Sequence, residues 1–92
     1  MSTLIIVDLS ITDKEKLNTY SALAAETLVP FGGEFIAKGA IEALHGEAQF
    51  QTKVVIQFPD RESATNWYAS SAYQKIISIR NQAMSSQFHL VS

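Results

Sequence analysis

The chain has 92 residues and no cysteine, a length that fits one domain, residues 1–92, without disulfides or thiolate metal sites. Nine acidic and seven basic residues give a net charge of −2 and form no basic patch, which argues against nucleic acid as a partner. The chain lacks the basic and long apolar segments of a signal peptide or a membrane span, so we expect a cytoplasmic protein with no membrane partner.

The first predicted elements are a strand and a helix. Residues 4–11 are apolar at nearly every position, which is typical of a strand that is buried on both faces. Thr12 and Glu15 have the spacing of a capping box, in which each side chain accepts a hydrogen bond from the other's backbone amide, so we expect the helix to begin there. Pro30 and the two glycines that follow it end this helix.

Two further strands are predicted next. Residues 34–44 form a strand that we expect to be interrupted by a bulge or bend near Gly39. Residues 45–47 then form a turn. Residues 53–58 are rich in valine, isoleucine and phenylalanine and form another strand, which Pro59 ends.

The rest of the chain predicts a helical segment and a last strand. Asp60 is the expected N-cap of the helical segment. The apolar stripe changes phase at Ser70 and Ser71, which predicts a break or kink there. Residues 87–91 alternate in a way that indicates a strand, with Phe88 facing one side.

This order of elements predicts an α+β fold, the ferredoxin-like βαββαβ arrangement, with helices on one face of a four-stranded antiparallel sheet. The open sheet face would expose Leu4, Ile6 and Val55 on a monomer. Charged residues form 17% of the chain, whereas an ordinary soluble domain carries about 25%. We therefore expect a homodimer that pairs through the open sheet face.

Residues spread over nearly the whole chain form a recognisable set: Asp13 and Tyr20, Gly32-Gly33 before Phe35, Lys38-Gly39, Gly46, the run from Val54 to Pro59, Ala64, Trp67-Tyr68, Ser70, Tyr73-Gln74 and Arg80. In these residues the chain resembles the domain of unknown function 1330 family, within the dimeric α/β barrel group. The resemblance implies the fold and the dimer. It implies no established reaction, because the wider group ranges from cofactor-free oxygenases to proteins with no known activity.

The sequence departs from the family's usual pattern at Lys38 and Lys53, where arginine is common, and at Ala40, His45 and Ser71. A lysine does not make the planar two-point contact with a carboxylate that an arginine makes. The two-point contact that those arginines could make with a ligand is therefore not expected at Lys38 or Lys53.

Arg80 is the most informative candidate for a binding site, because it falls among apolar residues on the inward stripe of its helix. A buried guanidinium needs a partner. In one interpretation Arg80 lies in a pocket and holds an anionic or carbonyl group of a ligand. In the other, it forms a salt bridge or bonds to carbonyls that fix the helix, or its stem reaches out to water.

Four aromatic side chains, Tyr20, Trp67, Tyr68 and Tyr73, are expected to face the sheet from the helices. They would line a cleft between helices and sheet and offer hydroxyl and indole groups to a ligand. An aromatic stripe at helical spacing is also typical of plain core packing, so both interpretations stay open.

The two histidines, His45 and His89, carry little evidence of chemistry. Together with Asp8, Glu42 and Glu47 they lack the spacing of a metal site, so we expect neither a metal nor a cofactor. No nucleophile is placed beside either histidine, and the G-x-S-x-G motif of hydrolases is missing from the sequence.

The sequence therefore favours a homodimer that binds a small, partly apolar molecule with an anionic group in a cleft between helices and sheet. The expected ligand contacts are Arg80 as anchor, with Tyr20, Trp67, Tyr73, Lys38 and His45. One alternative is a cofactor-independent enzyme, an oxygenase or isomerase in which Tyr20, His45 or His89 moves protons. Another is a structural or partner-binding module.

Overall fold

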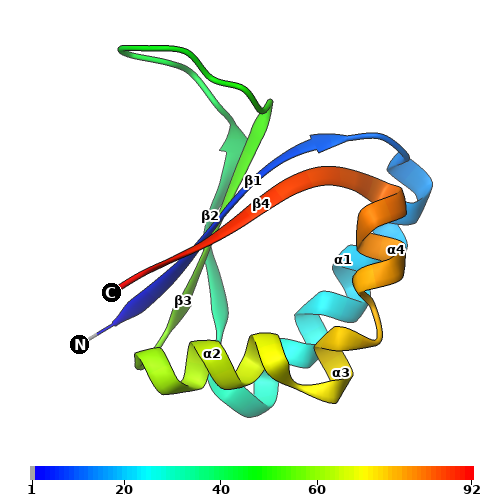
Figure 1. Ribbon diagram of the computed structural model, residues 1–92, viewed down its shortest axis with the longest axis vertical. Helices are drawn as coiled ribbons and strands as arrows, with labels where there is room; N and C mark the ends of the chain where they lie inside the picture. Colours follow the sequence, from blue (N-terminus) through cyan, green and yellow to red (C-terminus); the bar gives the residue numbers. More distant parts are fainter. Residues whose placement is uncertain (1) are drawn as a thin grey trace.

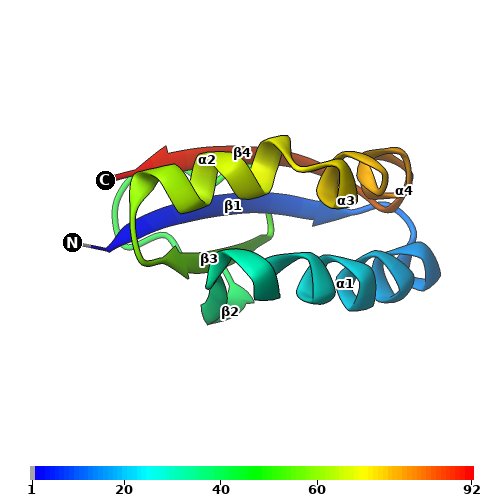
Figure 2. The same ribbon diagram turned by 90° about the horizontal axis from the view of Figure 1, so that it is seen from below.

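The computed structural model describes residues 2–92. It forms a four-stranded antiparallel sheet in the order β2-β3-β1-β4, with the helices on one face (Figure 1, Figure 2). The ferredoxin-like prediction is confirmed. None of the helices in these residues has the length and apolar character to cross a membrane. The elements are β1 (Thr3–Ile11), α1 (Lys14–Leu28), the 3-10 helix η1 (Val29–Phe31), β2 (Glu34–Ala40), β3 (Thr52–Phe58), α2 (Arg61–Ala69), α3 (Ser71–Gln74), α4 (Ile77–Ala83) and β4 (Met84–Val91).

β1 is a central strand whose two faces have different surroundings. Ile5, Val7 and Leu9 point to the helices and are 3–5% exposed. Ile6 points to the opposite face and lies between Val55 of β3 and His89 of β4 in the register. Within one chain the strand is therefore fully buried on one face only.

The cap of α1 differs from the prediction. Asp13, not Thr12, is the N-cap, and its side chain accepts from the backbone N–H of Lys16 at 3.1 Å. The Thr12 hydroxyl instead donates to the backbone oxygen of Gln82 at 3.0 Å, at the end of α4. The capping box is wrong because Asp13 caps the helix one residue later, and the Thr12 backbone N–H that Glu15 would need donates to the Ala83 oxygen at 2.9 Å.

Gly33 brings the end of α1 close to the sheet. A Cβ at this position would lie 2.7 Å from the Phe58 ring and 2.9 Å from the Leu28 side chain. Any larger residue would push these two core side chains apart, which costs stability in a closely packed core. The helical segment ends just before this point, at Gly32, which caps η1 with a φ of 70°.

The bulge in β2 lies at a different place from the one predicted. The register shifts between Phe35 and Ala37, whereas Gly39 pairs regularly with Lys53. Residues three apart on a regular strand face opposite sides of the sheet. Because of the extra residue, Phe35 and Lys38 both face the helices, opposite Ile56 and Val54. The bulge therefore turns a cation toward the inner face.

The predicted break in the second helical segment is confirmed. α2 ends at Ala69, and the Ser70 hydroxyl accepts from the backbone N–H of Tyr73 to cap α3. Asp60 caps α2 as expected, by accepting from the backbone N–H of Ser63 at 2.7 Å, and this bond lowers the pKa of its carboxyl. The break changes the phase of the segment, so that Trp67 and Tyr73 both face the sheet.

The connection between β2 and β3, residues 41–51, projects away from the sheet (Figure 1). The expected turn at residues 45–47 forms its outer part, where Gly46 has a φ of 82°. Leu44 in this connection is 93% exposed. The last strand begins at Met84, three residues before its predicted start.

Candidate functional site

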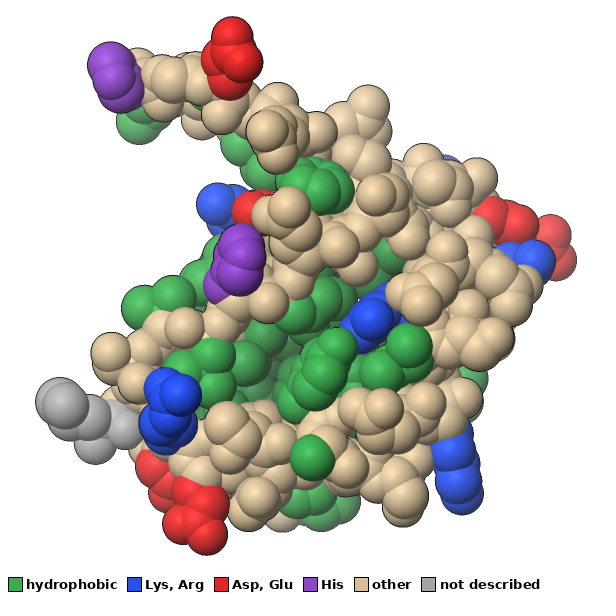
Figure 3. Space-filling view, viewed as in Figure 1, with side chains coloured by type: hydrophobic (Ala, Val, Ile, Leu, Met, Phe, Trp, Pro, Cys, Tyr) green, Lys and Arg blue, Asp and Glu red, His purple; other side chains and the backbone are tan. Residues whose placement is uncertain are grey.

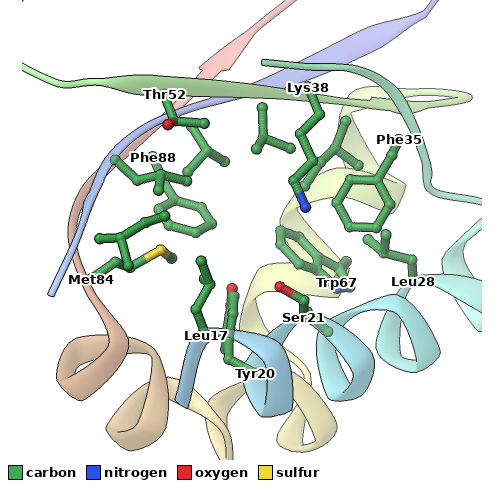
Figure 4. A pocket seen from close by; sticks show the side chains of 16 residues that line it. Leu17, Tyr20, Ser21, Leu28, Phe35, Lys38, Thr52, Trp67, Met84 and Phe88 are labelled. Carbon is green, nitrogen blue, oxygen red and sulfur yellow. The ribbon is translucent and has the colours of Figure 1, made fainter. Parts of the chain in front are cut away.

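A cavity of about 370 Å³ lies between the inner face of the sheet and α1 (Figure 4). Small-molecule sites range from about 300 to 1,000 Å³, so the cavity can hold a compact ligand. Figure 3 shows hydrophobic side chains gathered in the hollow between the sheet and the helices. The cavity is lined from the strands by Val7, Leu9, Ile11, Phe35, Lys38, Thr52, Val54, Ile56, Met84 and Phe88, and from the helices by Leu17, Tyr20, Ser21, Ala24, Leu28 and Trp67.

Lys38 is the one cationic residue among the residues that line the cavity, most of which are apolar. Figure 4 shows it reaching from β2 into the cavity, with its nitrogen turned toward the helices. Within residues 2–92 no carboxylate lies within ion-pair distance of Lys38, and no acidic side chain is part of the cavity wall. The ammonium group is thus available to an anion in the cavity.

Three hydroxyl groups add hydrogen-bonding capacity to the cavity. Those of Tyr20 and Ser21 point into it from α1, and that of Thr52 comes from β3 (Figure 4). Polar groups of this kind, placed among apolar side chains, orient a ligand and select it.

An aromatic wall closes the cavity at α2. Trp67 is 1% exposed, and its ring centroid lies 4.3 Å from that of Tyr73 and 5.4 Å from that of Phe58. Its indole N–H donates to the Thr27 hydroxyl at 2.9 Å. The polar atom of Trp67 is therefore used within the fold, and the ring faces the ligand space as an apolar surface.

Arg80 lies behind the cavity wall and is not part of the lining. Its Nη1 donates to the Tyr68 hydroxyl at 3.0 Å and to the Tyr73 hydroxyl at 3.2 Å. Its guanidinium carbon is 4.8 Å from the centroid of Phe88, a cation–π distance. Burial lowers the pKa of Arg80, but the bonds to the two tyrosines outweigh it and raise that pKa. Arg80 thus has its partners within the protein.

Tyr73 connects Arg80 to the cavity. Its hydroxyl oxygen lies 2.7 Å from that of Tyr20, which is a lining residue. Burial, followed by the nearby Tyr73, raises the pKa of Tyr20 well above its ordinary value. Burial also raises the pKa of Tyr73, against the opposing effect of its bonds to Tyr20 and Arg80. Both phenols are therefore neutral at physiological pH.

The raised pKa values of Tyr20 and Tyr73 predict a loss of stability in alkali. Unfolded tyrosines ionise near pH 10, whereas burial raises the pKa of both tyrosines in the folded state. Their contribution is full below about pH 10 and falls as the pH rises further, by up to about 1.4 kcal/mol per pH unit for each tyrosine. Urea unfolding between pH 8 and 11 measures this slope. A variant with Tyr20→Phe and Tyr73→Phe should show a shallower slope, and parallel curves would contradict the assignment.

The structure brings together some of the expected contact residues and separates others. Tyr20, Trp67 and Lys38 line the cavity. Arg80 and Tyr73 lie directly behind it. His45 lies in the projecting connection and is not part of the lining, and His89 lies on the outer face of the sheet. In the part of the chain that the structure describes, no three metal-ligating side chains gather in one place.

Sequence reasoning did not name Ser21, Phe35 and Phe88 as cavity residues. Phe88 could have been identified from the sequence, because the alternation in this strand places its side chain on one face of β4. Phe35 was hidden by the bulge that follows it. Ser21 lies one position beyond Tyr20, off the apolar stripe of α1, and it carried no signal.

Comparison with protein-family models decides the family of this chain. The model described as Domain of unknown function (DUF1330) matches residues 2–92. The chain belongs to this family. No curated protein matches this DUF1330 protein.

Solved structures show the same fold as this DUF1330 protein at low sequence identity. RPA0582, a protein of unknown function from Rhodopseudomonas palustris, has a TM-score of 0.78 at 13% identity, over 98% of this chain and 80% of that one. SnoaB, a cofactor-independent oxygenase from Streptomyces nogalater, has a TM-score of 0.69 at 11% identity, over 99% and 91%. A dimeric ferredoxin-like protein of unknown function from Thermobifida fusca has a TM-score of 0.67 at 11% identity, over 100% and 91%. At these identities the similarity shows the fold alone.

Proposed function

We propose that this DUF1330 protein binds a small molecule with an apolar body and an anionic group in the cavity between the sheet and α1. The observation that carries the proposal is the Lys38 ammonium turned into a cavity whose other lining is almost entirely apolar. The apolar walls gain free energy from burying the body of the ligand. Lys38 lies on an exposed strand, and its ammonium pairs with the anion through a charge-assisted hydrogen bond.

Lys38 takes the anchoring role for which the sequence favoured Arg80. The Arg80 guanidinium is occupied by Tyr68 and Tyr73 and does not reach the cavity lining. Lysine acts as a point charge without a fixed fork of donors, so we expect tolerance toward the orientation of the anion. The proposal assigns binding and no reaction, because neither His45 nor His89 lines the cavity.

A titration with 2-naphthoate, an aromatic carboxylate, and 2-naphthamide, its neutral analogue of the same shape, tests the proposal. A hydrogen bond to a charged group contributes about 1.5–3 kcal/mol. Lys38→Met should therefore weaken naphthoate binding by about tenfold or more and leave naphthamide binding nearly unchanged. Lys75→Met is the matched control, because it removes the same charge from an exposed position outside the cavity. Equal naphthoate affinity in Lys38→Met and the wild type would contradict the proposal.

We also propose that the protein is a homodimer that pairs through the outer face of the sheet. Leu4, Ile6 and Val55 lie on this face, and Val91 at its edge is 52% exposed. No helix of residues 2–92 covers them, since the helices lie on the other face (Figure 2). The similar proteins from Thermobifida fusca and a Jannaschia species are described as dimeric, which supports the same assembly here.

A further inference from the structure

We propose that Arg80, acting through Tyr73, orients the Tyr20 hydroxyl so that it donates a hydrogen bond into the cavity and selects ligands that carry a carbonyl oxygen. This inference rests on the proposed ligand-binding function and deepens it. The expected ligand is then an apolar molecule with two polar groups: a carboxylate that pairs with Lys38 and a separate carbonyl oxygen that accepts a hydrogen bond from Tyr20.

The chain of contacts runs from Arg80 to the cavity. Arg80 Nη1 lies 3.2 Å from the Tyr73 hydroxyl oxygen, which lies 2.7 Å from that of Tyr20. Tyr73 is 0% exposed, so no solvent water reaches its ring. Tyr20 is a lining residue, and Figure 4 shows its oxygen pointing into the cavity.

The donor and acceptor groups of Arg80, Tyr73 and Tyr20 determine which atom donates in each of these hydrogen bonds. A guanidinium only donates, so the Tyr73 oxygen accepts from Arg80. If Tyr20 also donated to Tyr73, the hydroxyl hydrogen of Tyr73 would need another acceptor, and residues 2–92 provide none. In the opposite arrangement Tyr73 donates to Tyr20. The hydrogen without a protein acceptor is then that of Tyr20, which faces the cavity, where water or a ligand can accept it. Tyr73 therefore donates to Tyr20, and the Tyr20 hydrogen is left to point into the cavity.

The surroundings hold this arrangement in place. Arg80 is also held by the Tyr68 hydroxyl, which accepts from the same Nη1, and by the Phe88 ring. Tyr20 keeps its proton at neutral pH, because burial raises its pKa. It therefore acts as a neutral donor, which suits a carbonyl oxygen, while Lys38 suits the anionic end of the ligand.

Nuclear magnetic resonance of the protein with Cζ-labelled tyrosine tests the direction of the bond without a ligand. The slowly exchanging hydroxyl proton of the pair should be bonded to Tyr73, and the Tyr20 proton should exchange faster with water. A slowly exchanging proton on Tyr20 that points to Tyr73 would overturn the inference, whatever the cavity binds.

Paired ligands test the selection. A series of 2-naphthoates with an acetyl group at position 5, 6, 7 or 8 is compared with isopropenyl analogues, in which a methylene replaces the carbonyl oxygen. At least one acetyl compound should bind the wild type about three- to tenfold more tightly than its analogue. Tyr20→Phe should abolish this ratio. A ratio near one across the series, with Lys38-dependent binding intact, would overturn the inference and leave the proposed function standing.

Variants of Arg80 test whether this residue orients the Tyr20 hydroxyl or only stabilises the fold. Arg80→Met keeps an apolar stem and should reduce the acetyl preference, whereas Arg80→Lys keeps a donor and should restore part of it. In a Tyr20→Phe background, Arg80→Met should have no further effect on the ratio, because the two residues act through one hydroxyl. A purely structural Arg80 would weaken both members of each pair equally. If no naphthoate binds the wild type at all, the proposed function fails, and the resonance measurement still decides the bond direction.

Discussion

Replacement of Trp67 with alanine is expected to lower the free energy of unfolding by about 3–5 kcal/mol, the usual range for removing a large buried aromatic ring. Trp67 is 1% exposed and packs against Tyr73 and Phe58 at ring-centroid distances of 4.3 and 5.4 Å. It also donates to Thr27, whose buried hydroxyl would lose a partner. Natural domains have a total stability of about 5–15 kcal/mol, so the variant should be close to unfolding.

Urea unfolding followed by circular dichroism measures this loss. Trp67→Phe is the matched control, because it keeps an aromatic ring and removes the indole N–H. Its cost should be smaller, about 1–2 kcal/mol, from the lost bond and the smaller ring. A loss below about 1 kcal/mol in Trp67→Ala would show that the surroundings of Trp67 collapse around the missing ring without penalty, and would contradict its role in the core.

A charge at the centre of the outer sheet face is expected to separate the proposed dimer. Ile6 lies between Val55 and His89 in the middle of this face. In a face-to-face pairing of two sheets, Ile6→Glu would bury two carboxylates near each other and without partners, which costs several kcal/mol. The wild type should have about twice the mass of 10.1 kDa, and the variant should have the monomer mass.

Light scattering at micromolar concentration distinguishes the two states. Leu23→Glu on α1 is the matched control, because Leu23 is also apolar, is 38% exposed and lies away from the outer face. This variant should stay dimeric, and the circular dichroism spectra of both variants should match the wild type. A wild type at the monomer mass, or an Ile6→Glu variant that stays dimeric, would contradict the proposed interface.

The fold was predictable because most of its signals are local or periodic. The apolar runs of β1 and β3, the alternation in β4 and the break at Ser70 were visible in the sequence, and the order of these elements indicated the topology. The wrong details depended on tertiary partners. Thr12 has the spacing of a capping box, but the end of α4 takes its hydroxyl. Similarly, Gly39 suggested a bulge that the structure places between Phe35 and Ala37.

The sequence predicted several residues of the candidate site, but it did not predict which of their side chains contact one another. A charge on an apolar helix stripe indicated that Arg80 needs partners, but the sequence could not show whether these are tyrosines or a ligand. The partners Tyr68 and Tyr73 lie on either side of the helix break, and only the fold brings both to one guanidinium. Lys38 entered the candidate set through the family resemblance, and the bulge explains why it faces the cavity.

The crystal structure of the protein with 2-naphthoate tests the central claim most directly. The claim is that the cavity between the sheet and α1 holds an apolar anion at Lys38. The naphthalene ring should lie among the lining residues of the sheet and α1, and a carboxylate oxygen should lie within 4 Å of Lys38 Nζ, the limit of an ion pair. A naphthoate bound only elsewhere, or bound in the cavity with its carboxylate turned away from Lys38, would contradict the account.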